Sequence, residues 1–478
     1  MISTIILLVI TLITVIVILL LNKKGNENVN TKFSQILAVA YFGLFFVGLI
    51  LPDAFIKSVG DNIFELNTLS KPHAILRIFN ACTPIILIIA TFFKNRLFKN
   101  LAVYICLPVT IISIFSYNTY MLYYLDPQGR GINMIYWLNQ GVKDVSLNQV
   151  FRTIWLSLEW LIAFIITLKI YIVDKHRFCV KNAKEWIYLL ITLILLMIQN
   201  TPIYVPQILF GYSNIIFDGF SVSHIIWILY LPIKVVVLTF LFKKKSDQTK
   251  LALCFVLALS LLIQYNSMFA LTINIKRLPL QLCNLASYLI IIALITKNKH
   301  IFNFNFLINA VGATLALAVP DVNGTGIFEV WNMHFIYEHT NVMVVPILCL
   351  TLGIFPKMDK RSLLDAFIGF SVYFIICLIL NTVLNGIAIK TGNNYFEVNY
   401  LFMYNKKVII DLIPAFEIFT RVELGSDIYK IMPHLSLFVY VGYTALYVAL
   451  YLGLRLKDLI KDKVKEKRAL QEALASGL

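Results

Sequence analysis

Apolar stretches of about 20 residues alternate with short polar segments along almost the whole chain. A helix needs about 20 apolar residues to cross the hydrocarbon core of a bilayer, so this pattern predicts an all-α polytopic membrane protein. We predict about thirteen transmembrane helices, with boundaries good to several residues. They cover residues 2–21, 34–51, 73–93, 101–124, 151–173, 186–208, 223–242, 251–272, 278–296, 303–320, 334–354, 364–388 and 433–454.

The basic residues of the loops predict the orientation. Of the 41 Lys and Arg residues, 26 fall in the segments that follow the odd-numbered spans, including the C-terminal tail. The alternate loops hold 12, most of them balanced by acidic residues. Cytoplasmic loops carry an excess of Lys and Arg, so the N-terminus is expected outside and the C-terminus in the cytoplasm. An odd number of spans preserves this alternation.

The composition also indicates a membrane protein, and it argues against nucleic-acid binding, disulfide bonds and a metal site. The chain is 59% hydrophobic and only 14% charged, with a mean hydropathy of +0.81, whereas soluble domains have about 25% charged residues. The net charge of +16 is explained by the loop charges, because no nucleic-acid-binding motif accompanies it. The seven cysteines lie mostly inside apolar runs and form no CxxC pair. We therefore predict neither a disulfide framework nor a metal site, and we expect no cofactor.

The two ends of the chain add smaller expectations. The first apolar segment is expected to be a retained helix rather than a signal peptide, because no basic residue precedes Ile2 and no small-residue cleavage site follows Leu21. The tail at 456–478 is predicted to be a basic cytoplasmic helix. It could lie against anionic headgroups, or it could be a solvated helix that only supplies positive charge.

Five polar residues lie at the same end of consecutive predicted spans: His224, Cys283, Asp321, His339 and Asn385. With the predicted orientation, all five fall in the outer leaflet near the headgroups. Polar and ionisable groups inside a membrane are costly, and they usually mark functional sites. Their common level therefore predicts one built site.

The residue types in this set suggest nucleophilic catalysis. A cysteine nucleophile needs a base or a cation nearby to form its thiolate, and His339 lies at a depth similar to that of Cys283. Asp321 or Glu338 could orient this histidine, as the third member of a catalytic triad does. Gln281, two residues before the cysteine, could donate a hydrogen bond to an oxyanion.

Each of these residues also has a purely structural interpretation. A free cysteine in an apolar helix is usually a small hydrophobic residue, and Asp321 beside Pro320 could be a turn residue. Asn381 and Asn385 share a helix face and could form interhelical hydrogen bonds.

Three other polar residues are expected at the edge of the membrane. A separation of five residues turns His334 about 140° away from His339, so we expect His334 at the interface. Arg77 and Lys234 are interpreted as lying one or two turns from the outer ends of their spans. There they could extend to the surface or hold an anionic headgroup.

Motifs of the second half suggest a relationship. They are SVSHIIW at 221–227, LPLQLCNLASYL at 278–289, GATLALAVPDV at 312–322, HFIYEHTNVMVVPIL at 334–348, NTVLN at 381–385 and NYLFMY at 399–404. This pattern resembles the bacterial YwaF-like integral membrane family, which is similar to the eukaryotic transmembrane protein 164 acyltransferases. The resemblance covers about residues 215–455. We therefore predict an N-terminal transmembrane module at 1–214, which could be a degenerate repeat, a YwaF-like domain at 215–455 and the tail at 456–478.

The resemblance implies a membrane-embedded acyltransferase, in which a cysteine takes an acyl chain from a phospholipid and passes it to a lysolipid. Carried onto this chain, Cys283 is the nucleophile and His339 the base. The chain departs from the family at Gln281, because the family commonly has LPLHLC with histidine there. The expected substrate-binding residues are His224, which matches the family's first-helix histidine, and the later polar positions Asn381, Asn385, Asn399 and Tyr400.

The leading hypothesis is acyl transfer or acyl-ester hydrolysis on a phospholipid or lysolipid of a bacterial plasma membrane. If the family's histidine at position 281 is the working base, this protein has lost it and would be non-catalytic or would rely on His339. The alternative is a transporter or a non-catalytic lipid-binding protein that uses the same polar cavity.

Overall fold

The computed structural model describes most of the chain. It covers residues 1–24, 27–50, 56–59, 63–66, 71–93, 95–117, 149–203, 205–211, 213–267, 279–318, 320, 322, 324–404 and 414–475. Asp321, one of the predicted site residues, lies outside the described residues. The described chain is mainly α-helical, and its strands form three separate two-stranded ribbons. This architecture confirms the prediction of an all-α polytopic membrane protein.

The chain divides into two compact units that interleave in sequence. The first unit comprises residues 1–277 and 320–345, and the second comprises residues 278–319 and 346–478. The helix α15 (Val330–Thr351) passes from the first unit into the second at Pro346. The boundaries of these units differ from those expected near residues 214 and 455. The expected boundaries rest on sequence resemblance and not on contacts within the fold, so the predicted domains stay a prediction.

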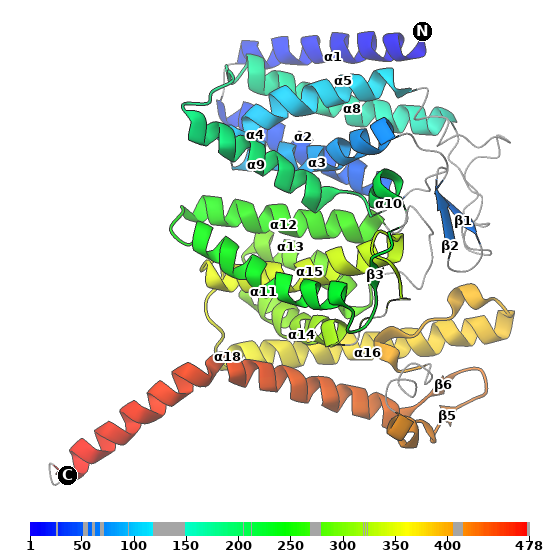
Figure 1. The fold of residues 1–478 in the computed structure, drawn as a ribbon, viewed down its shortest axis with the longest axis vertical. Helices are drawn as coiled ribbons and strands as arrows, with labels where there is room; N and C mark the ends of the chain where they lie inside the picture. Colours follow the sequence, from blue (N-terminus) through cyan, green and yellow to red (C-terminus); the bar gives the residue numbers. More distant parts are fainter. Residues whose placement is uncertain are drawn as a thin grey trace. The chain divides into compact units, whose positions relative to one another are not determined.

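The first unit holds most of the helices, which run roughly parallel or antiparallel to one another in Figure 1. Besides the first part of α15, they are α1 (Ile2–Lys24), α2 (Glu27–Ile50), α3 (Lys71–Phe92), α4 (Arg96–Leu101), the π-helical turn η1 (Ala102–Cys106), α5 (Leu107–Phe115), α8 (Gln149–Ile172), α9 (Ala183–Asn200), α10 (Val205–Phe210), α11 (Val222–Phe242) and α12 (Asp247–Ser267).

The ribbons of the first unit are short. The strands β1 (Ile56–Val59) and β2 (Ile63–Leu66) form one antiparallel pair. The strands β3 (Ile216–Phe217) and β4 (Thr325–Gly326) form another, in which Ile216 lies opposite Gly326. The second pair joins the segments that precede α11 and α15, and it therefore fixes the starts of these two helices relative to each other.

The N-terminal helices of the first unit pack around a buried apolar core. Residues of α1, α3, α5 and α8 meet there, including Ile10, Leu76 and Trp160. The ring of Tyr117, just after α5, packs edge-on against Trp160 with centroids 5.9 Å apart. α3 is central to this arrangement, because more than half of its residues are buried.

The second unit is built from α13 (Leu282–Thr296), α14 (Lys299–Ala318), α16 (Lys360–Thr391) and α18 (Pro433–Ala475). α14 packs against each of the other three. Between α16 and α18 lie the 3-10 turns η4 (Asn394–Phe396), η5 (Tyr400–Phe402) and η6 (Pro414–Thr420), and the paired strands β5 (Leu424–Gly425) and β6 (Lys430–Ile431).

Local sequence explains where the long helix α16 begins and ends. Asp359 accepts a hydrogen bond from the N–H of Ser362 (2.9 Å), and the Ser362 hydroxyl bonds back to the Asp359 N–H, which forms a capping box. Gly392 ends the helix with φ 65°, a left-handed conformation that glycine adopts without steric cost. The 32 residues span about 48 Å at 1.5 Å per residue, which exceeds the roughly 30 Å core of a bilayer.

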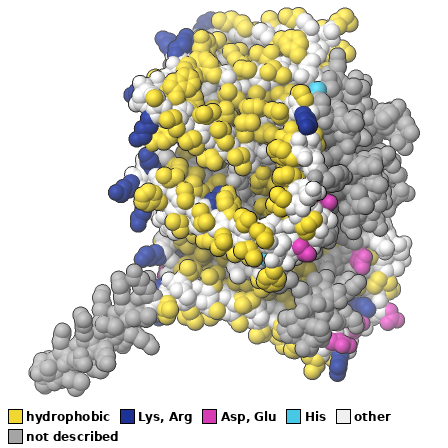
Figure 2. Space-filling view, viewed as in Figure 1, with side chains coloured by type: hydrophobic (Ala, Val, Ile, Leu, Met, Phe, Trp, Pro, Cys, Tyr) yellow, Lys and Arg dark blue, Asp and Glu magenta, His cyan; other side chains and the backbone are white. Residues whose placement is uncertain are grey.

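Within the described residues, eleven helices are long and apolar enough to cross a membrane. Each of the thirteen predicted spans overlaps a described helix. Two of these helices do not meet the length and hydropathy needed to cross a membrane. α13 has only 15 residues, and α15 has 22 residues but carries several polar side chains. Over the first unit, hydrophobic side chains cover the face seen in Figure 2, while Lys and Arg gather at one end of its helices.

Candidate functional site

Cys283 lies in the first turn of α13, as the second residue of the helix, and it is half-buried. A methyl group placed on Gly312 of α14 would come within 3.9 Å of the Cys283 Sγ, so the sulfur lies against the smallest residue of the facing helix. Tyr373 and Tyr443 are close enough to Cys283 to interact with it electrostatically. The N–H groups of a first helical turn have no partner within the helix, so this end of α13 presents backbone donors beside the thiol.

The start of α13 is fixed by α16. The hydroxyl of Tyr373 donates to the carbonyl of Leu280, and the Cys377 thiol lies 3.9 Å from the same oxygen. Gln281, at the N-cap of α13, makes no capping hydrogen bond with its side chain. Instead its Nε2 donates to the carbonyl of Asn399 at 3.4 Å. The residue expected to bind an oxyanion is therefore turned toward the segment that precedes η5.

Two asparagines of α16 hold that segment. The Asn381 side chain donates to the carbonyl of Tyr400 and accepts from its N–H, both at 2.8 Å. Asn385 makes the same pair of bonds to Val398, at 2.8 and 3.1 Å. We call this arrangement the asparagine clamp. It brings together four of the predicted substrate-binding residues, because Asn399 lies between the two clamped residues.

Hydrogen bonds within the protein engage both amide protons of Asn385. One of its amide N–H bonds is used by Val398, and the other donates to the carbonyl of Asn381 at 2.7 Å. An amide with both protons engaged has none left for a substrate oxyanion. The Asn385 side chain therefore holds the backbone in place, and the substrate-binding role expected for it stays a prediction.

Tyr400 is placed by the clamp as a buried side chain. Only 1% of its surface is exposed. Burial raises the pKa of its phenol to about 12, so the hydroxyl is neutral at physiological pH and can act as a hydrogen-bond donor. Leu401, next in the chain, adopts a left-handed φ of 55°, which is unusual for a leucine and turns the backbone sharply after the clamp.

The predicted histidines lie in the first unit, and their hydrogen bonds assign their tautomers. His339 is buried, and its Nδ1 is 2.9 Å from the carbonyl of Phe335. A carbonyl can only accept, so Nδ1 carries the proton and Nε2 is the basic nitrogen. His224 is fully buried, and its Nδ1 accepts from the N–H of Phe220 at 2.9 Å. The proton of neutral His224 is therefore on Nε2, where it acts as a donor.

His334 is buried near the start of α15. It is only 7% exposed, and its Nε2 is 3.1 Å from the carboxylate of Glu338. Its expected depth near the membrane interface stays a prediction. The aromatic rings of Tyr265 and Trp331 flank it. Glu338 therefore partners His334, one turn earlier in α15, and it also interacts electrostatically with His339. The orienting role considered for Glu338 stays a prediction.

The two residues of the predicted catalytic pair belong to different units. Cys283 is in the second unit and His339 is in the first. Gln281, Asn381, Asn385, Asn399 and Tyr400 accompany the cysteine, whereas His224 accompanies the histidine. The pairing of Cys283 with His339 stays a prediction. Within the described part of the chain, no group of three or more His, Cys, Asp and Glu side chains is arranged to hold a metal ion.

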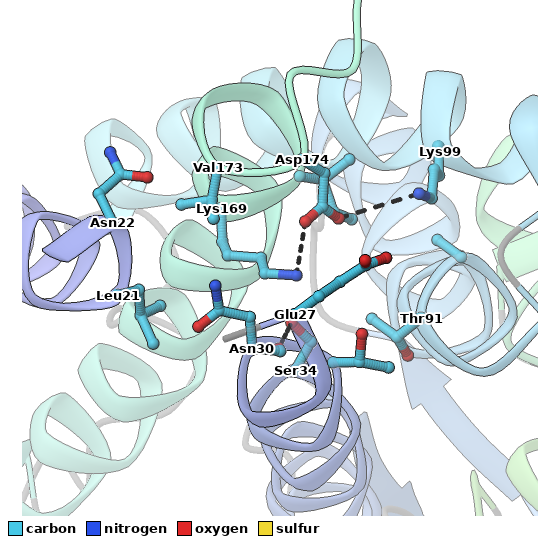
Figure 3. Close-up of a pocket in the computed structure, with 13 residues that line it drawn as sticks. Leu21, Asn22, Glu27, Asn30, Ser34, Thr91, Lys99, Lys169, Val173 and Asp174 are labelled. Carbon is cyan, nitrogen blue, oxygen red and sulfur yellow. Dashed lines mark hydrogen bonds and ion pairs between the residues drawn. The ribbon is translucent and has the colours of Figure 1, made fainter. Parts of the chain in front are cut away.

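A polar cavity of about 430 Å³ lies elsewhere in the first unit, among α1, α2, α3, α4 and α8. Lys169 is buried in its wall and donates to Asp174 at 2.7 Å, and Lys99 reaches the other oxygen of the same carboxylate at 3.8 Å. Figure 3 shows both lysines pointing toward Asp174. None of the predicted site residues lines this cavity. The cavity was not predicted from the sequence, although a lysine such as Lys169 inside an apolar span often marks a functional site.

The second half of the chain is similar to a known family of membrane proteins. Residues 219–426 match the model of the TMEM164 family, which confirms the resemblance to the transmembrane protein 164 proteins predicted from the motifs. The matched region contains Cys283, His339 and the asparagine clamp. No curated protein and no solved structure matches the chain significantly. Together with the eleven candidate spans, the match identifies a multi-pass membrane protein.

Proposed function

We propose, from the match of residues 219–426 to the TMEM164 family, that this membrane protein transfers or hydrolyses lipid acyl esters, with Cys283 as nucleophile and His339 as base. The observation that carries the proposal is the position of Cys283 in the first turn of α13. The positive end of the helix dipole stabilises negative charge on a sulfur placed there. The half-buried thiol can also be approached by a substrate.

The first chemical step would form an acyl-thioester. His339 Nε2 takes the thiol proton, and the sulfur attacks the ester carbonyl of a phospholipid. The carbon–oxygen bond to the glycerol then breaks, and the same nitrogen returns the proton to the leaving alkoxide. The products are acyl-Cys283 and a lysolipid.

The second step would regenerate the enzyme. A lysolipid hydroxyl gives up its proton to His339 and attacks the thioester, which forms the new ester and releases the thiol. Water in place of the lysolipid gives a free fatty acid, so the same site accounts for transfer and for hydrolysis. The acceptor alone decides between the two outcomes.

The oxyanion of both steps is assigned to backbone groups. Since both Asn385 N–H bonds are engaged and Gln281 donates to Asn399, we assign the oxyanion to the first-turn N–H groups of α13. Donors held in this way cost no reorganisation during the reaction. In this proposal the asparagine clamp shapes the wall of the site and does not act on the substrate directly.

The setting of the reaction belongs to the same proposal. We place the site in the outer leaflet of a bacterial plasma membrane, with the N-terminus outside and the basic ends of the helices in the cytoplasm. The gathering of Lys and Arg side chains at one end of the first unit supports this orientation.

One observation favours a second candidate function, lipid binding without chemistry. Gln281 stands where the related family commonly has histidine, and it forms a hydrogen bond within the protein. If that histidine is required for catalysis, the chain would keep the site and bind lipid without turning it over.

The two functions are separated by an acyl-transfer assay on the whole protein in phospholipid nanodiscs. Phospholipid with a labelled acyl chain and unlabelled lysolipid are supplied, and labelled product is measured for wild type, Cys283→Ser and Cys377→Ser. Cys377 is a matched control, because it is buried in the same unit and contacts Leu280. Catalysis at Cys283 predicts that only Cys283→Ser loses turnover. Wild type that binds lipid but gives no product supports the second function.

A further inference from the structure

A lysine lies deep within an apolar helix of the first unit. Lys234 is twelve residues after the start of α11 and eight before its end. At 1.5 Å per residue these separations are about 18 and 12 Å, which is close to the midplane of a hydrocarbon core about 30 Å thick. The expectation that Lys234 lies one or two turns into its span is therefore wrong.

The ammonium group is held by two neutral side chains. Lys234 Nζ donates to Gln199 Oε1 of α9 at 3.0 Å and to Asn341 Oδ1 of α15 at 3.2 Å. Among the described residues, no carboxylate lies within salt-bridge distance of it. These contacts hold the side chain inside the unit, so it does not extend to the membrane surface.

The three side chains together have more donors than acceptors. Because both amide oxygens face the ammonium, the amide nitrogens must point away from it. Neither Gln199 Nε2 nor Asn341 Nδ2 has a hydrogen-bond partner in the described part of the chain. Asn341 is fully buried, and an unpartnered buried donor is costly. The cluster therefore lacks an acceptor with negative charge.

The surroundings of the cluster are apolar and open to lipid. Lys234 is half-buried, and the neighbouring Ile233 and Val237 of α11 are 58% and 47% exposed. The ring of Tyr230, one turn earlier, lies 5.7 Å from Nζ. An anion that reaches this depth must carry an apolar chain that can lie along α11.

We propose that Lys234, Gln199 and Asn341 form a binding site for the carboxylate of a long-chain fatty acid. A protonated fatty acid can enter the hydrocarbon core, where a phospholipid phosphate cannot follow without leaving the headgroup layer. If the lysine is charged on arrival, the acid binds as its carboxylate after giving its proton to water. If the lysine is neutral, the acid passes its proton to Nζ, and the same ion pair results. The site does not depend on catalysis at Cys283.

The test uses a long-chain fatty acid that carries a diazirine and an alkyne, cross-linked by light to the whole protein in nanodiscs. We expect Lys234→Met to lower the captured fraction about ten- to hundred-fold, as for the loss of a charge-assisted hydrogen bond. Lys243→Gln is the matched control, because Lys243 is an exposed lysine at the end of the same helix, and it should bind as wild type does. Equal capture by wild type and Lys234→Met would overturn the proposal.

A second variant separates binding from folding. Asn341→Asp replaces the amide with a carboxylate of the same shape, which gives Lys234 an internal counter-ion. We expect this variant to unfold at the same or a higher temperature than wild type and still to lose capture of the fatty acid. Retained capture in a folded Asn341→Asp protein would contradict the proposal.

Two further probes define the chemical class of the ligand. The first probe is a fatty alcohol with the same chain and diazirine. Wild type should capture it weakly, at the level at which Lys234→Met captures the fatty acid. Strong capture of the alcohol would show that apolar contact alone is responsible, which overturns the site. An unlabelled alkyl phosphate should compete poorly with the fatty acid probe, and competition better than that of the unlabelled fatty acid would overturn the carboxylate assignment.

Discussion

The side chain of Asn381 forms two hydrogen bonds to the backbone of a single residue, Tyr400, one to its carbonyl and one from its N–H, both at 2.8 Å. Asn385, one turn later in α16, repeats the pattern at Val398. Each asparagine side chain thus pairs with both the N–H and the carbonyl of one residue, as a neighbouring strand does in a sheet. The segment that follows α16 is therefore fixed to the helix, although it has no regular secondary structure between η4 and η5.

We expect Asn385→Ala to destabilise the second unit by about 2–4 kcal/mol. The change removes three buried hydrogen bonds and leaves backbone groups of Val398 without partners. Hydrogen exchange should rise over residues 394–404, and thermal unfolding in detergent should shift to lower temperature. Thr382→Ala is the control, because the Thr382 hydroxyl donates to the carbonyl of Leu378 in its own helix. Equal effects of the two variants would refute a special role for the clamp.

His339→Asn should abolish catalysis while the fold is kept. The asparagine Nδ2 can still donate to the Phe335 carbonyl, as the histidine Nδ1 does, but it has no basic nitrogen. Loss of a general base lowers turnover by about 10²–10⁴-fold. The melting temperature should change little, and His434→Asn, at an exposed position in α18, should keep full turnover. Normal turnover in His339→Asn would exclude His339 as the base.

The capping box of α16 predicts a dependence of stability on pH. The Ser362 N–H holds the pKa of Asp359 below its ordinary value of 3.8. For an acid with a lowered folded pKa, the stabilisation is complete above the unfolded value and is lost as the pH falls through the folded value. Asp359→Ala should cost about 1 kcal/mol at pH 7.

The difference in stability between wild type and Asp359→Ala should shrink when unfolding is measured at pH 3. The exposed Asp427 serves as the control, and Asp427→Ala should match wild type at both pH values. A deficit of Asp359→Ala that does not change with pH would contradict the assignment.

Cys179 tests the proposed orientation. It is in the segment between α8 and α9, outside the helices, and it is partly exposed beside Arg96. If this segment is cytoplasmic, a membrane-impermeant maleimide should leave Cys179 unlabelled in intact cells and label it in inside-out vesicles. The Cys179→Ser variant identifies the labelled site. Labelling of Cys179 in intact cells would reverse the orientation and move the proposed site to the cytoplasmic leaflet.

Much of the fold follows from local sequence. Membrane helices need long apolar stretches, and all thirteen predicted spans overlap helices for that reason. α13 is shorter than expected because it starts only at Leu282, after the turn at Pro279–Leu280. Helix length thus depends on a local turn that hydropathy does not detect.

The candidate site was less predictable, because its geometry depends on tertiary contacts. Spacing placed Asn381 and Asn385 on one face, but their hydrogen bonds go to the backbone of Tyr400 and Val398 and not to a neighbouring transmembrane helix. The burial of His334 depends on Glu338, one turn later, and on rings from other positions. A helical-wheel argument gives the angle between two histidines but not which neighbours surround each one.

The proposed acyl transfer depends most on covalent chemistry at Cys283, and mass spectrometry of the peptide that contains this residue tests it directly. The protein in nanodiscs is incubated with a phospholipid that has one defined acyl chain, quenched in acid and digested. We predict that the peptide gains the mass of that acyl group, that hydroxylamine removes it, and that Cys283→Ser protein does not carry it as a thioester. An unmodified Cys283 in protein that turns over the phospholipid would contradict the account.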